Sequence, residues 1–237
     1  MRPCIVWKFA CRTVAFALAG SSIGNGVAAR GIPQFARAVV AGEARVIDGD
    51  TIQVAGVRIR LEGIDAPETG QSCQWPDGSD WNCGNVASAE LEKLVRGQTV
   101  SCDPSGLDKY GRTLAICFVA EHEINAAMVE RGLAWAFVRY STRYVATEAA
   151  AREARVGIWH GAATPAWSFR EQLWSQAAVE APHDCAIKGN AGRKGLIYHM
   201  PWSPWYRKVR MDNTARKRWF CSESEAVQAG FRPALWR

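Results

Sequence analysis

Several features that would mark a zinc-binding, membrane or repeat protein are missing from this sequence. No CxxC spacing occurs among its eight cysteines, which disfavours a zinc site. The apolar run near the N-terminus, residues 14–19, is far shorter than the roughly 20 apolar residues that a membrane-spanning helix needs. There is no internal repeat and no long low-complexity tract. With 48% apolar and 22% charged residues, the composition is that of a globular protein.

Acidic residues are missing from the first 29 positions, which contain Arg2, Lys8 and Arg12. The apolar run follows these basic residues, and the segment ends in the small residues Val27-Ala28-Ala29. This order is typical of a secretory signal peptide rather than of a membrane anchor, and it predicts cleavage after Ala29. We therefore expect an exported protein, periplasmic or secreted, with no stable membrane insertion after residues 1–29 are removed.

Six cysteines remain after position 29, and an even number in an exported chain indicates disulfides. Two of them bracket a loop that is rich in turn residues, and two lie on strands that flank a turn. The remaining two are the cysteines of the last section. The predicted pairs are Cys73–Cys83, Cys102–Cys117 and Cys185–Cys221, with a metal site as the less favoured alternative.

Charge divides the chain into two sections. Residues 183–237 contain 11 Lys and Arg against 4 Asp and Glu, a net charge of +7. Residues 30–182 contain 15 against 19, a net charge of −4. A break of this size indicates a domain boundary near Pro182. We expect a domain over residues 30–161, a Trp-containing connector over 162–182, and a small basic domain over 183–237.

The hydrophobic pattern predicts an α+β fold, because short alternating segments are separated by helix-like ones. Expected strands lie at residues 43–47, 51–54, 57–62, about 98–102 and 112–119, with a short extended piece at 133–138. Expected helices lie at residues 86–96, with Asn85 as N-cap, and at about 123–131 and 143–156. Five short strands with three helices suit a small closed barrel capped by helices.

Three acidic residues and two arginines fall at strand ends or turns of this predicted barrel. Carboxylates suit a hard cation such as calcium or magnesium. A guanidinium group can hold two phosphate oxygens at once, and a nearby glutamate can hold or deprotonate a water molecule. The set predicts metal-dependent phosphodiester cleavage, and its members are Asp50, Asp65, Glu68, Arg60 and Arg112.

Each of these residues, taken singly, has a plainer interpretation. Asp48-Gly49-Asp50 has the composition of a turn between strands. Arg60 suits a solvated strand face, and Arg112 suits the loop of a hairpin. The combination, rather than any one residue, favours a catalytic site.

Three segments carry a resemblance to a known family: residues 48–51 (DGDT), 60–68 (RLEGIDAPE) and 108–112 (DKYGR). In this order they resemble the signature segments of staphylococcal nuclease (thermonuclease) domains, over roughly residues 41–161. The resemblance implies a five-stranded OB-fold barrel with three helices. It also implies calcium-dependent, endonucleolytic cleavage of DNA, RNA or both.

Roles follow from this resemblance by position. It implies that the side chains of Asp50 and Asp65 and the backbone carbonyl of Ala66 bind the metal. The cofactor is then Ca²⁺, with Mg²⁺ or Mn²⁺ as alternatives. The resemblance also implies a general base and two phosphate-binding arginines. We take these three catalytic residues to be Glu68, Arg60 and Arg112.

Substrate contacts are expected from Lys109, Tyr110 and Tyr140. Two stretches depart from the family pattern. The loop after Glu68 carries two cysteines and two tryptophans, and residues 135–140 read WAFVRY where the family has tyrosines near the nucleotide. These departures affect substrate access and the contacts to the base or the 5′ phosphate.

The last section resembles the small "sunset" domain of some nuclease-like bacterial proteins. Its aromatic residues alternate with basic ones over residues 202–219, a pattern that can bind single-stranded nucleic acid. The alternative is that the aromatic rings form the core of a small domain and the charges face solvent.

From the sequence we expect an exported, monomeric, calcium-dependent endonuclease that acts on DNA, RNA or both. Two other classes stay open. One is a non-catalytic OB-fold protein that binds nucleic acid or the cell envelope, and the other is a structural surface protein.

Overall fold

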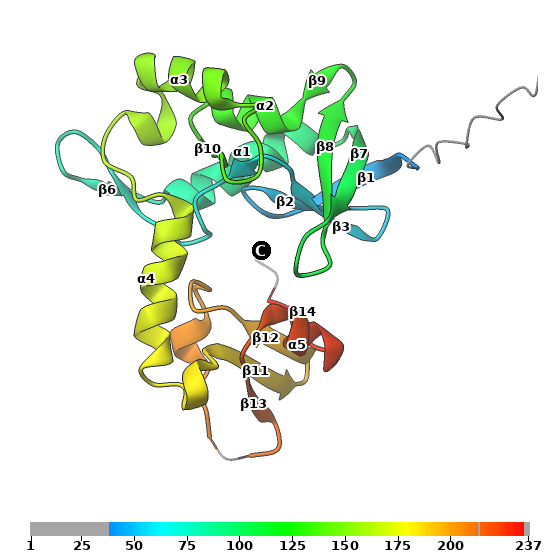
Figure 1. Ribbon diagram of the computed structural model, residues 1–237, viewed down its shortest axis with the longest axis vertical. Coiled ribbons are helices and arrows are strands. Elements are labelled where there is room, and N and C mark those ends of the chain that lie inside the picture. The colour runs from blue at the N-terminus through cyan, green and yellow to red at the C-terminus, as the bar shows by residue number, and fades with distance from the viewer. Residues whose placement is uncertain (1–37, 213, 235–237) are drawn as a thin grey trace, which may run out of the picture. The chain divides into compact units, whose positions relative to one another are not determined.

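A closed barrel of five strands forms the first section of the structure, a computed structural model (Figure 1). Neighbouring strands are antiparallel, except that β3 pairs with β8 in parallel and so closes the sheet. The predicted α+β barrel fold is therefore confirmed. The barrel strands are β1 (Val40–Asp48), β2 (Thr51–Val54), β3 (Val57–Leu61), β7 (Thr99–Leu107) and β8 (Thr113–Val119).

The structure describes residues 38–212 and 214–234. The predicted signal peptide at residues 1–29 lies outside these residues. In the described part of the chain, no helix is both long and apolar enough to cross a membrane.

Alternation along the strands builds the barrel core, as the sequence predicts. Ile59 and Leu61 on β3 are fully buried, while the arginines between and before them turn to the other face. The two-residue connection of β2 to β3, Ala55-Gly56, has positive φ at both positions. This conformation matches the twist of a tight hairpin, so the predicted tight connection is confirmed.

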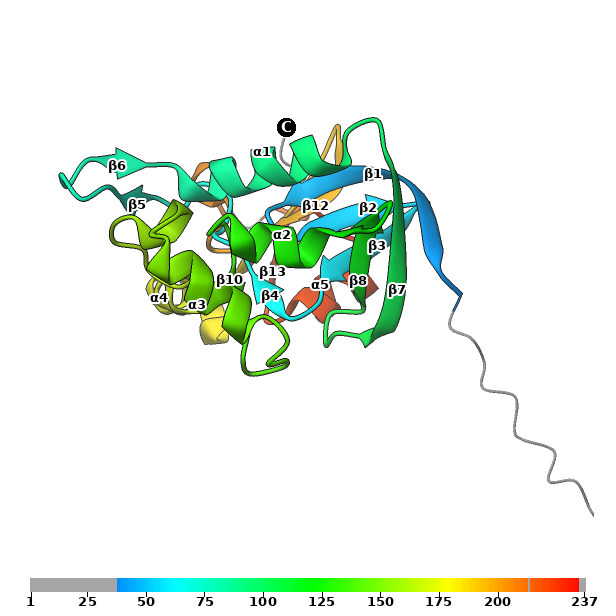
Figure 2. The same cartoon turned by 90° about the horizontal axis from the view of Figure 1, so that it is seen from above.

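Two helices pack on the barrel, α1 (Cys83–Val95) and α2 (Ile124–Glu130), and a third, α3 (Val145–Glu153), packs on α2. Helix α1 lies along β1 in Figure 2. Asn85 was expected to be its N-cap, but the helix begins at Cys83 and the N-cap is Asn82. The earlier start has a tertiary cause, because Cys83 is tied to Cys73 by a disulfide and Gly84 packs on the backbone of Glu68.

Short strands complete the first section. The loop after Glu68 forms a hairpin of β5 (Cys73–Gln74) and β6 (Asp80–Trp81), in which the rings of Trp75 and Trp81 stack 4.7 Å apart. Strand β4 (Ile64–Asp65) pairs with β10 (Trp135–Ala136), and β9 (His122–Glu123) extends the sheet beyond β8.

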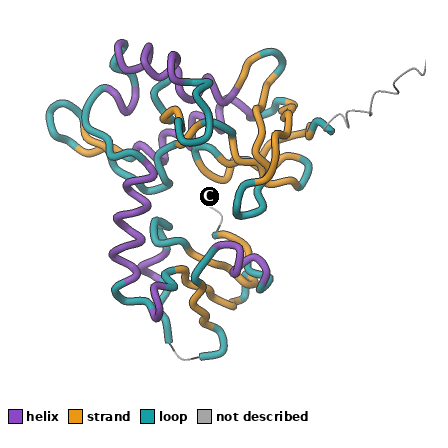
Figure 3. Tube along the Cα trace, viewed as in Figure 1, coloured by secondary structure: helices purple, strands orange, loops and turns teal. Residues whose placement is uncertain are grey.

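Residues 162–182, which we expect to be a Trp-containing connector, consist mostly of helix α4 (Ala166–Ala178), shown in Figure 3. Pro165 is its N-cap residue, a position where the N–H that proline lacks has no partner within the helix. The buried and half-buried positions recur at intervals of three and four residues, which is the spacing of one helix face. Those with this spacing are Ala166, Phe169, Arg170, Leu173, Trp174 and Ala177; Ser168 and Ala178 are also half-buried.

A four-stranded sheet forms the last section, in the order β13-β11-β12-β14. Its small core contains Ile187, Tyr198, Phe220 and Ala226. The elements are β11 (Ile187–Gly192), β12 (Gly195–His199), β13 (Lys217–Phe220), α5 (Glu223–Gln228) and β14 (Arg232–Pro233). Single turns of 3-10 helix occur at η1 (Gly157–Trp159), η2 (Pro182–Asp184) and η3 (Tyr206–Lys208).

The three predicted disulfides are formed. Cys102 faces Cys117 across the β7–β8 pair, and Cys73 is joined to Cys83 at the start of α1. Cys185–Cys221 ties the last section together. Disulfides form and persist in oxidising surroundings, which agrees with the expected export.

Candidate active site

Asp50 is positioned by the turn between β1 and β2. The backbone N–H of Asp50 donates to Oδ1 of Asp48 at 3.1 Å, and Oδ2 of Asp50 accepts the N–H of Ala66 at 2.8 Å. The predicted turn is therefore present, and it directs Asp50 into the protein, so that only 3% of this residue is exposed. The turn and the site are compatible interpretations of the same segment.

Arg60 bridges the two aspartates. Its guanidinium forms an ion pair with Asp50, and its Nη2 lies 2.6 Å from Oδ1 of Asp65. The side chain is 12% exposed, so Arg60 is not a solvated residue of a strand face. Burial lowers the pKa of Arg60, and the neighbouring Asp65 opposes this effect. The two carboxylates therefore face one common point beside β3.

Glu68 joins this cluster through a residue that was not predicted, Arg170 of α4. Nη1 of Arg170 lies 2.7 Å from Oε1 of Glu68 and 3.0 Å from Oδ1 of Asp65, and its Nη2 lies 2.8 Å from Oδ2 of Asp65. Burial raises the pKa of Glu68 to about 7, against the opposing charge of Arg170. Burial alone would lower the pKa of Arg170, but Asp65 and Glu68 raise it.

The helix signals that would have revealed Arg170 are present in the sequence. Pro165 marks a helix start, and the apolar spacing of residues 166–177 places Arg170 on the buried face of that helix. What the signals cannot supply is the partner, because Arg170 is 105 residues from Asp65.

The hydrogen bonds of Arg112 are made to Asp108 of the hairpin loop rather than to the carboxylates of Asp50, Asp65 and Glu68. Its Nε donates to Oδ2 of Asp108 at 2.6 Å, and its backbone N–H donates to Oδ1 of the same residue at 2.9 Å. Tyr110 lies beneath two cations, with its ring centre 4.8 Å from Nζ of Lys109 and 5.3 Å from the guanidinium carbon of Arg112. The hairpin loop thus presents a compact group of one ring and two positive charges.

One cleft of about 630 Å³ brings the two groups together. Asp65 and Ala66 lie outside its lining, buried behind Asp50 and Arg60. The predicted residues that line it are Asp50, Arg60, Glu68, Lys109, Tyr110, Arg112 and Tyr140. Lining residues that were not predicted include Arg58, Arg139, Trp167, Arg170 and Trp202.

Aromatic side chains form one wall of the cleft. The ring of Phe137 stacks on Trp167 of α4 at 5.7 Å, and Tyr140 packs on Phe137 at 5.0 Å. Tyr140 is 67% exposed, so its ring is accessible from solvent. Flat, accessible rings beside cations are the groups on which unpaired bases stack.

The last section contacts the barrel beside this cleft. Nη1 of Arg58 on β3 lies 3.3 Å from both Oε1 of Glu223 and the hydroxyl of Tyr198. Tyr198 also donates to Glu223, and burial together with this carboxylate raises the pKa of Tyr198. The contact joins β3 to the start of α5 and to β12.

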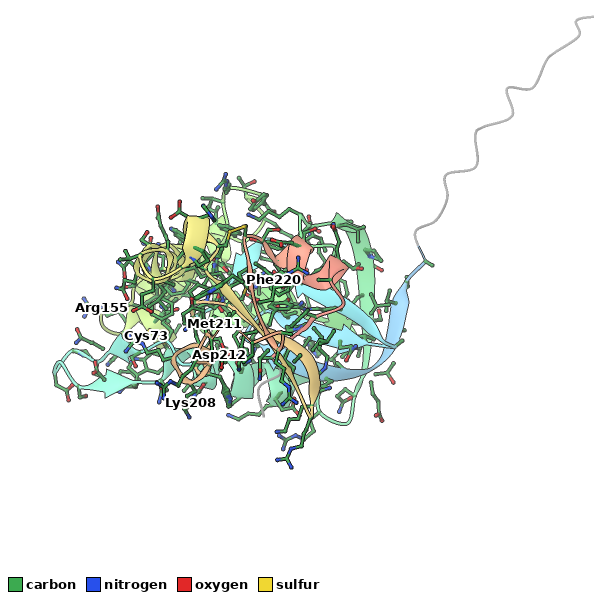
Figure 4. All side chains as sticks on the ribbon, turned by 90° about the horizontal axis from the view of Figure 1, so that it is seen from below. Cys73, Arg155, Lys208, Met211, Asp212 and Phe220 are labelled. Carbon is green, nitrogen blue, oxygen red and sulfur yellow. A yellow bond between two sulfur atoms is a disulfide. The ribbon has the colours of Figure 1, made fainter. Side chains whose placement is uncertain are left out.

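The basic residues of the last section are mostly at its surface. Lys208, labelled in Figure 4, is exposed, as are Arg207, Arg210, Arg216 and Arg218. The rings are more enclosed, since Tyr206 is buried and the tryptophans at 202, 205 and 219 are half-buried. This distribution favours the interpretation in which most of the aromatics pack inside and the charges face solvent.

The donor chemistry of the cluster suits a hard divalent cation. Asp50 and Asp65 supply carboxylate oxygens, and the N–H of Ala66 bound to Asp50 brings that residue's backbone beside them. Within the described residues, however, no three His, Cys, Asp or Glu side chains converge as a ready-made metal centre. An ion fits here if Asp65 exchanges a guanidinium partner for it.

Comparison with known families gives two matches. Residues 58–161 match the model described as staphylococcal nuclease homologue. Residues 173–233 match a model described as ArfC, so the expected likeness to a sunset domain is not confirmed.

Comparison with curated proteins gives several similar chains. The micrococcal nuclease of Shigella flexneri is 33% identical over 144 residues, covering 53% of this chain and 77% of that protein. An uncharacterized endonuclease of Escherichia coli O157:H7 is 35% identical over 136 residues, covering 54% and 82%. The succinoglycan biosynthesis protein ExoI of Rhizobium meliloti (strain 1021) is 36% identical over 126 residues, covering 51% of this chain and 64% of that protein.

Proposed function

Because this chain belongs to the staphylococcal nuclease family, we propose that it is an exported, calcium-dependent endonuclease that hydrolyses phosphodiester bonds of DNA, RNA or both. One observation carries the proposal: a buried aspartate, a glutamate and arginines line a single cleft, and a second buried aspartate is paired with two of those arginines. The export part is supported by the three disulfides and by the signal-like first 29 residues. We take the active protein to be a monomer.

The proposed chemistry divides among these residues. Asp50, Asp65 and the Ala66 carbonyl would hold the cation, which when bound polarises a phosphoryl oxygen. Glu68 holds a water molecule and accepts its proton, a role that suits a carboxylate whose pKa burial raises to about 7. Arg60 and Arg112 neutralise the charge that develops on the phosphate oxygens, because a guanidinium binds two such oxygens at once.

Substrate binding is proposed for the hairpin loop and the aromatic wall. Lys109 supplies positive charge, and Tyr110 and Tyr140 supply rings on which bases stack. We also keep the proposed division into a catalytic section over residues 30–161, a connector over 162–182 and a basic section over 183–237. In this division the catalytic section performs the chemistry and the basic section attracts nucleic acid.

A second candidate function is a non-catalytic protein that binds nucleic acid or the cell envelope. The observation in its favour is that one relative is named for succinoglycan biosynthesis rather than for nuclease activity. All five charged residues that the family resemblance assigns to the site are present in this chain, which favours the enzyme.

A digestion assay separates the two candidates. Residues 30–237 would be incubated with plasmid DNA and with RNA, in calcium or in a chelator. We expect cleavage in calcium and none in the chelator, and we expect Asp50→Asn to remove the activity. Tight binding of either nucleic acid without any cleavage would favour the non-catalytic candidate instead.

A further inference from the structure

Arg170 brings a second guanidinium to Asp65, beside that of Arg60, and the phosphate-binding roles proposed for Arg60 and Arg112 do not account for it. Its side chain is 22% exposed and reaches the barrel from α4, a helix outside the matched nuclease segment at 58–161. Three hydrogen bonds of 2.7–3.0 Å fix its guanidinium between Asp65 and Glu68. These hydrogen bonds join residues that are 102 or 105 positions apart in sequence, which raises the question of what Arg170 does at the candidate site.

We propose that Arg170 is a positioning residue that competes with the divalent cation for Asp65. The inference rests on the function proposed above, since it assumes that Asp65 is a metal ligand. In the state described here Arg170 neutralises Asp65 and holds Glu68 beside it. Binding of the cation requires that this contact be given up in part.

Competition is expected, first, because Asp65 already accepts hydrogen bonds at both of its oxygens. Both carboxylate oxygens accept from Arg170, and Oδ1 also accepts from Arg60. Asp65 is fully buried, so water does not stand in for a lost partner. Three of the roughly four acceptor positions of this carboxylate are thus taken, so a cation that binds Oδ1, or both oxygens at once, must displace at least one N–H of a guanidinium.

Competition is expected, second, because a divalent cation is repelled by the guanidinium groups that are already bound to the aspartates. Asp65 and Asp50 already share Arg60, so the cluster contains two guanidinium groups before any metal enters. A divalent cation beside Arg170 is repelled by it, and the low polarity of a buried site strengthens this repulsion. The effect is reciprocal: the contact of Arg170 with Asp65 weakens metal binding, and a bound metal weakens that contact by the same factor.

The position of Arg170 links this competition to the rest of the chain. Trp174, one turn further along α4, packs against the hydrophobic clusters of the last section. Helix α4 therefore contacts the carboxylate cluster with one residue and the basic section with another. Binding of the cation is expected to loosen the first contact while the second stays in place.

The test is a calorimetric titration of calcium into residues 30–237, as wild type and as variants. Arg170→Gln should bind calcium about ten- to a hundredfold more tightly, because charge-assisted hydrogen bonds of this kind each oppose binding by that order. Arg170→Lys keeps the positive charge but loses the paired N–H donors of the guanidinium. Its calcium affinity should therefore lie between those of wild type and Arg170→Gln. Arg96→Gln is the matched control, since it removes a 73% exposed arginine at the C-cap of α1, and its calcium affinity should equal that of wild type.

Equal or weaker calcium binding by folded Arg170→Gln would overturn the inference, and so would a failure of every variant to bind calcium. If Arg170→Gln does not fold, as judged by circular dichroism, Arg170→Lys decides by the same criterion. Plasmid cleavage on the same samples keeps the two proposals apart. Cleavage by wild type with no gain in calcium affinity defeats the competition alone, whereas tighter calcium binding without cleavage supports the competition and defeats the nuclease assignment.

Discussion

At the scale of single residues, Arg112 gives the most direct test of the proposed site, because it lines the cleft while its hydrogen bonds are to Asp108 in the hairpin. Arg112→Ala should lower kcat by roughly 10²–10³, the usual loss when one donor to a developing charge is removed. The measurement is the cleavage rate at saturating substrate. Arg131→Ala, which breaks a surface pair with Glu90, should cleave at the wild-type rate. Equal rates for Arg112→Ala and wild type would remove Arg112 from the site.

Gly84 is a second residue whose importance appears only in the structure. A Cβ atom at this position would lie 1.8 Å from the carbonyl oxygen of Glu68, so the segment carrying Glu68 must move in Gly84→Ala. We expect the variant to lose most of its activity and about 1–3 kcal/mol of unfolding free energy, as overpacking usually costs. Activity and urea denaturation measure the two effects. Gly106→Ala, where a Cβ meets nothing within 4 Å, should behave as wild type, and similar behaviour of both variants would contradict the prediction.

At the scale of elements, the disulfide between β7 and β8 is expected to contribute most directly to the barrel, because it joins two neighbouring strands. Replacing Cys102 and Cys117 by alanine should lower the unfolding free energy by about 2–5 kcal/mol. Urea denaturation under non-reducing conditions gives the value. Peptide mapping of the wild type should recover the same pair, and free thiols at these positions would show that the bond does not form in the protein.

At the scale of the whole molecule, the basic section is expected to attract nucleic acid, which the net negative charge of residues 30–182 does not. Its net charge is +7, against −4 for residues 30–182. A protein that ends near Pro182 should still cleave at saturating substrate but should bind nucleic acid more weakly and with a flatter salt dependence. Each lost phosphate contact removes about 0.7–0.9 from the salt slope of log affinity.

Salt titrations of both lengths, with Glu68→Gln to prevent cleavage, measure this difference. Loss of the section also removes Glu223 and Tyr198 from Arg58, which then faces the cleft alone. Glu223→Gln in the full chain, which removes the carboxylate from Arg58 but keeps the basic section, is therefore the matched control for that change. Equal affinity and equal slope at both lengths would assign the basic section to another partner.

Acid should weaken the last section through His199. Burial, with smaller effects of Lys217 and Lys188, lowers the pKa of His199 to about 4. The unfolded chain has a histidine pKa near 6.5, so between these values the unfolded state binds a proton that the folded state does not. Stability is therefore complete above about pH 6.5 and falls as the pH drops toward 4. Thermal melting from pH 7 to pH 4.5 should show this fall in wild type and a smaller one in His199→Gln; identical pH profiles would contradict the assignment.

Local patterns in the sequence determined the barrel and most of its candidate site. Alternation along residues 51–54 and 57–62 predicts β2 and β3, because side chains of a strand face opposite sides in turn. Cysteine placement predicts the three disulfides, since one pair brackets a loop, one lies on adjacent strands, and one consists of the two cysteines of the last section. The ordered acidic and basic segments at 48–68 and 108–112 predict the residues that share the cleft.

Tertiary structure alone decided which of these charges touch. Arg60 bridges two aspartates, and Arg170 reaches Asp65 and Glu68 across 105 and 102 residues of chain. The start of α1 at Cys83 likewise depends on a disulfide and on close packing against Glu68. The physical reason is common to all three. Hydrophobic period and turn composition act over a few residues, whereas an ion pair depends on the position of a partner that only the completed fold brings near.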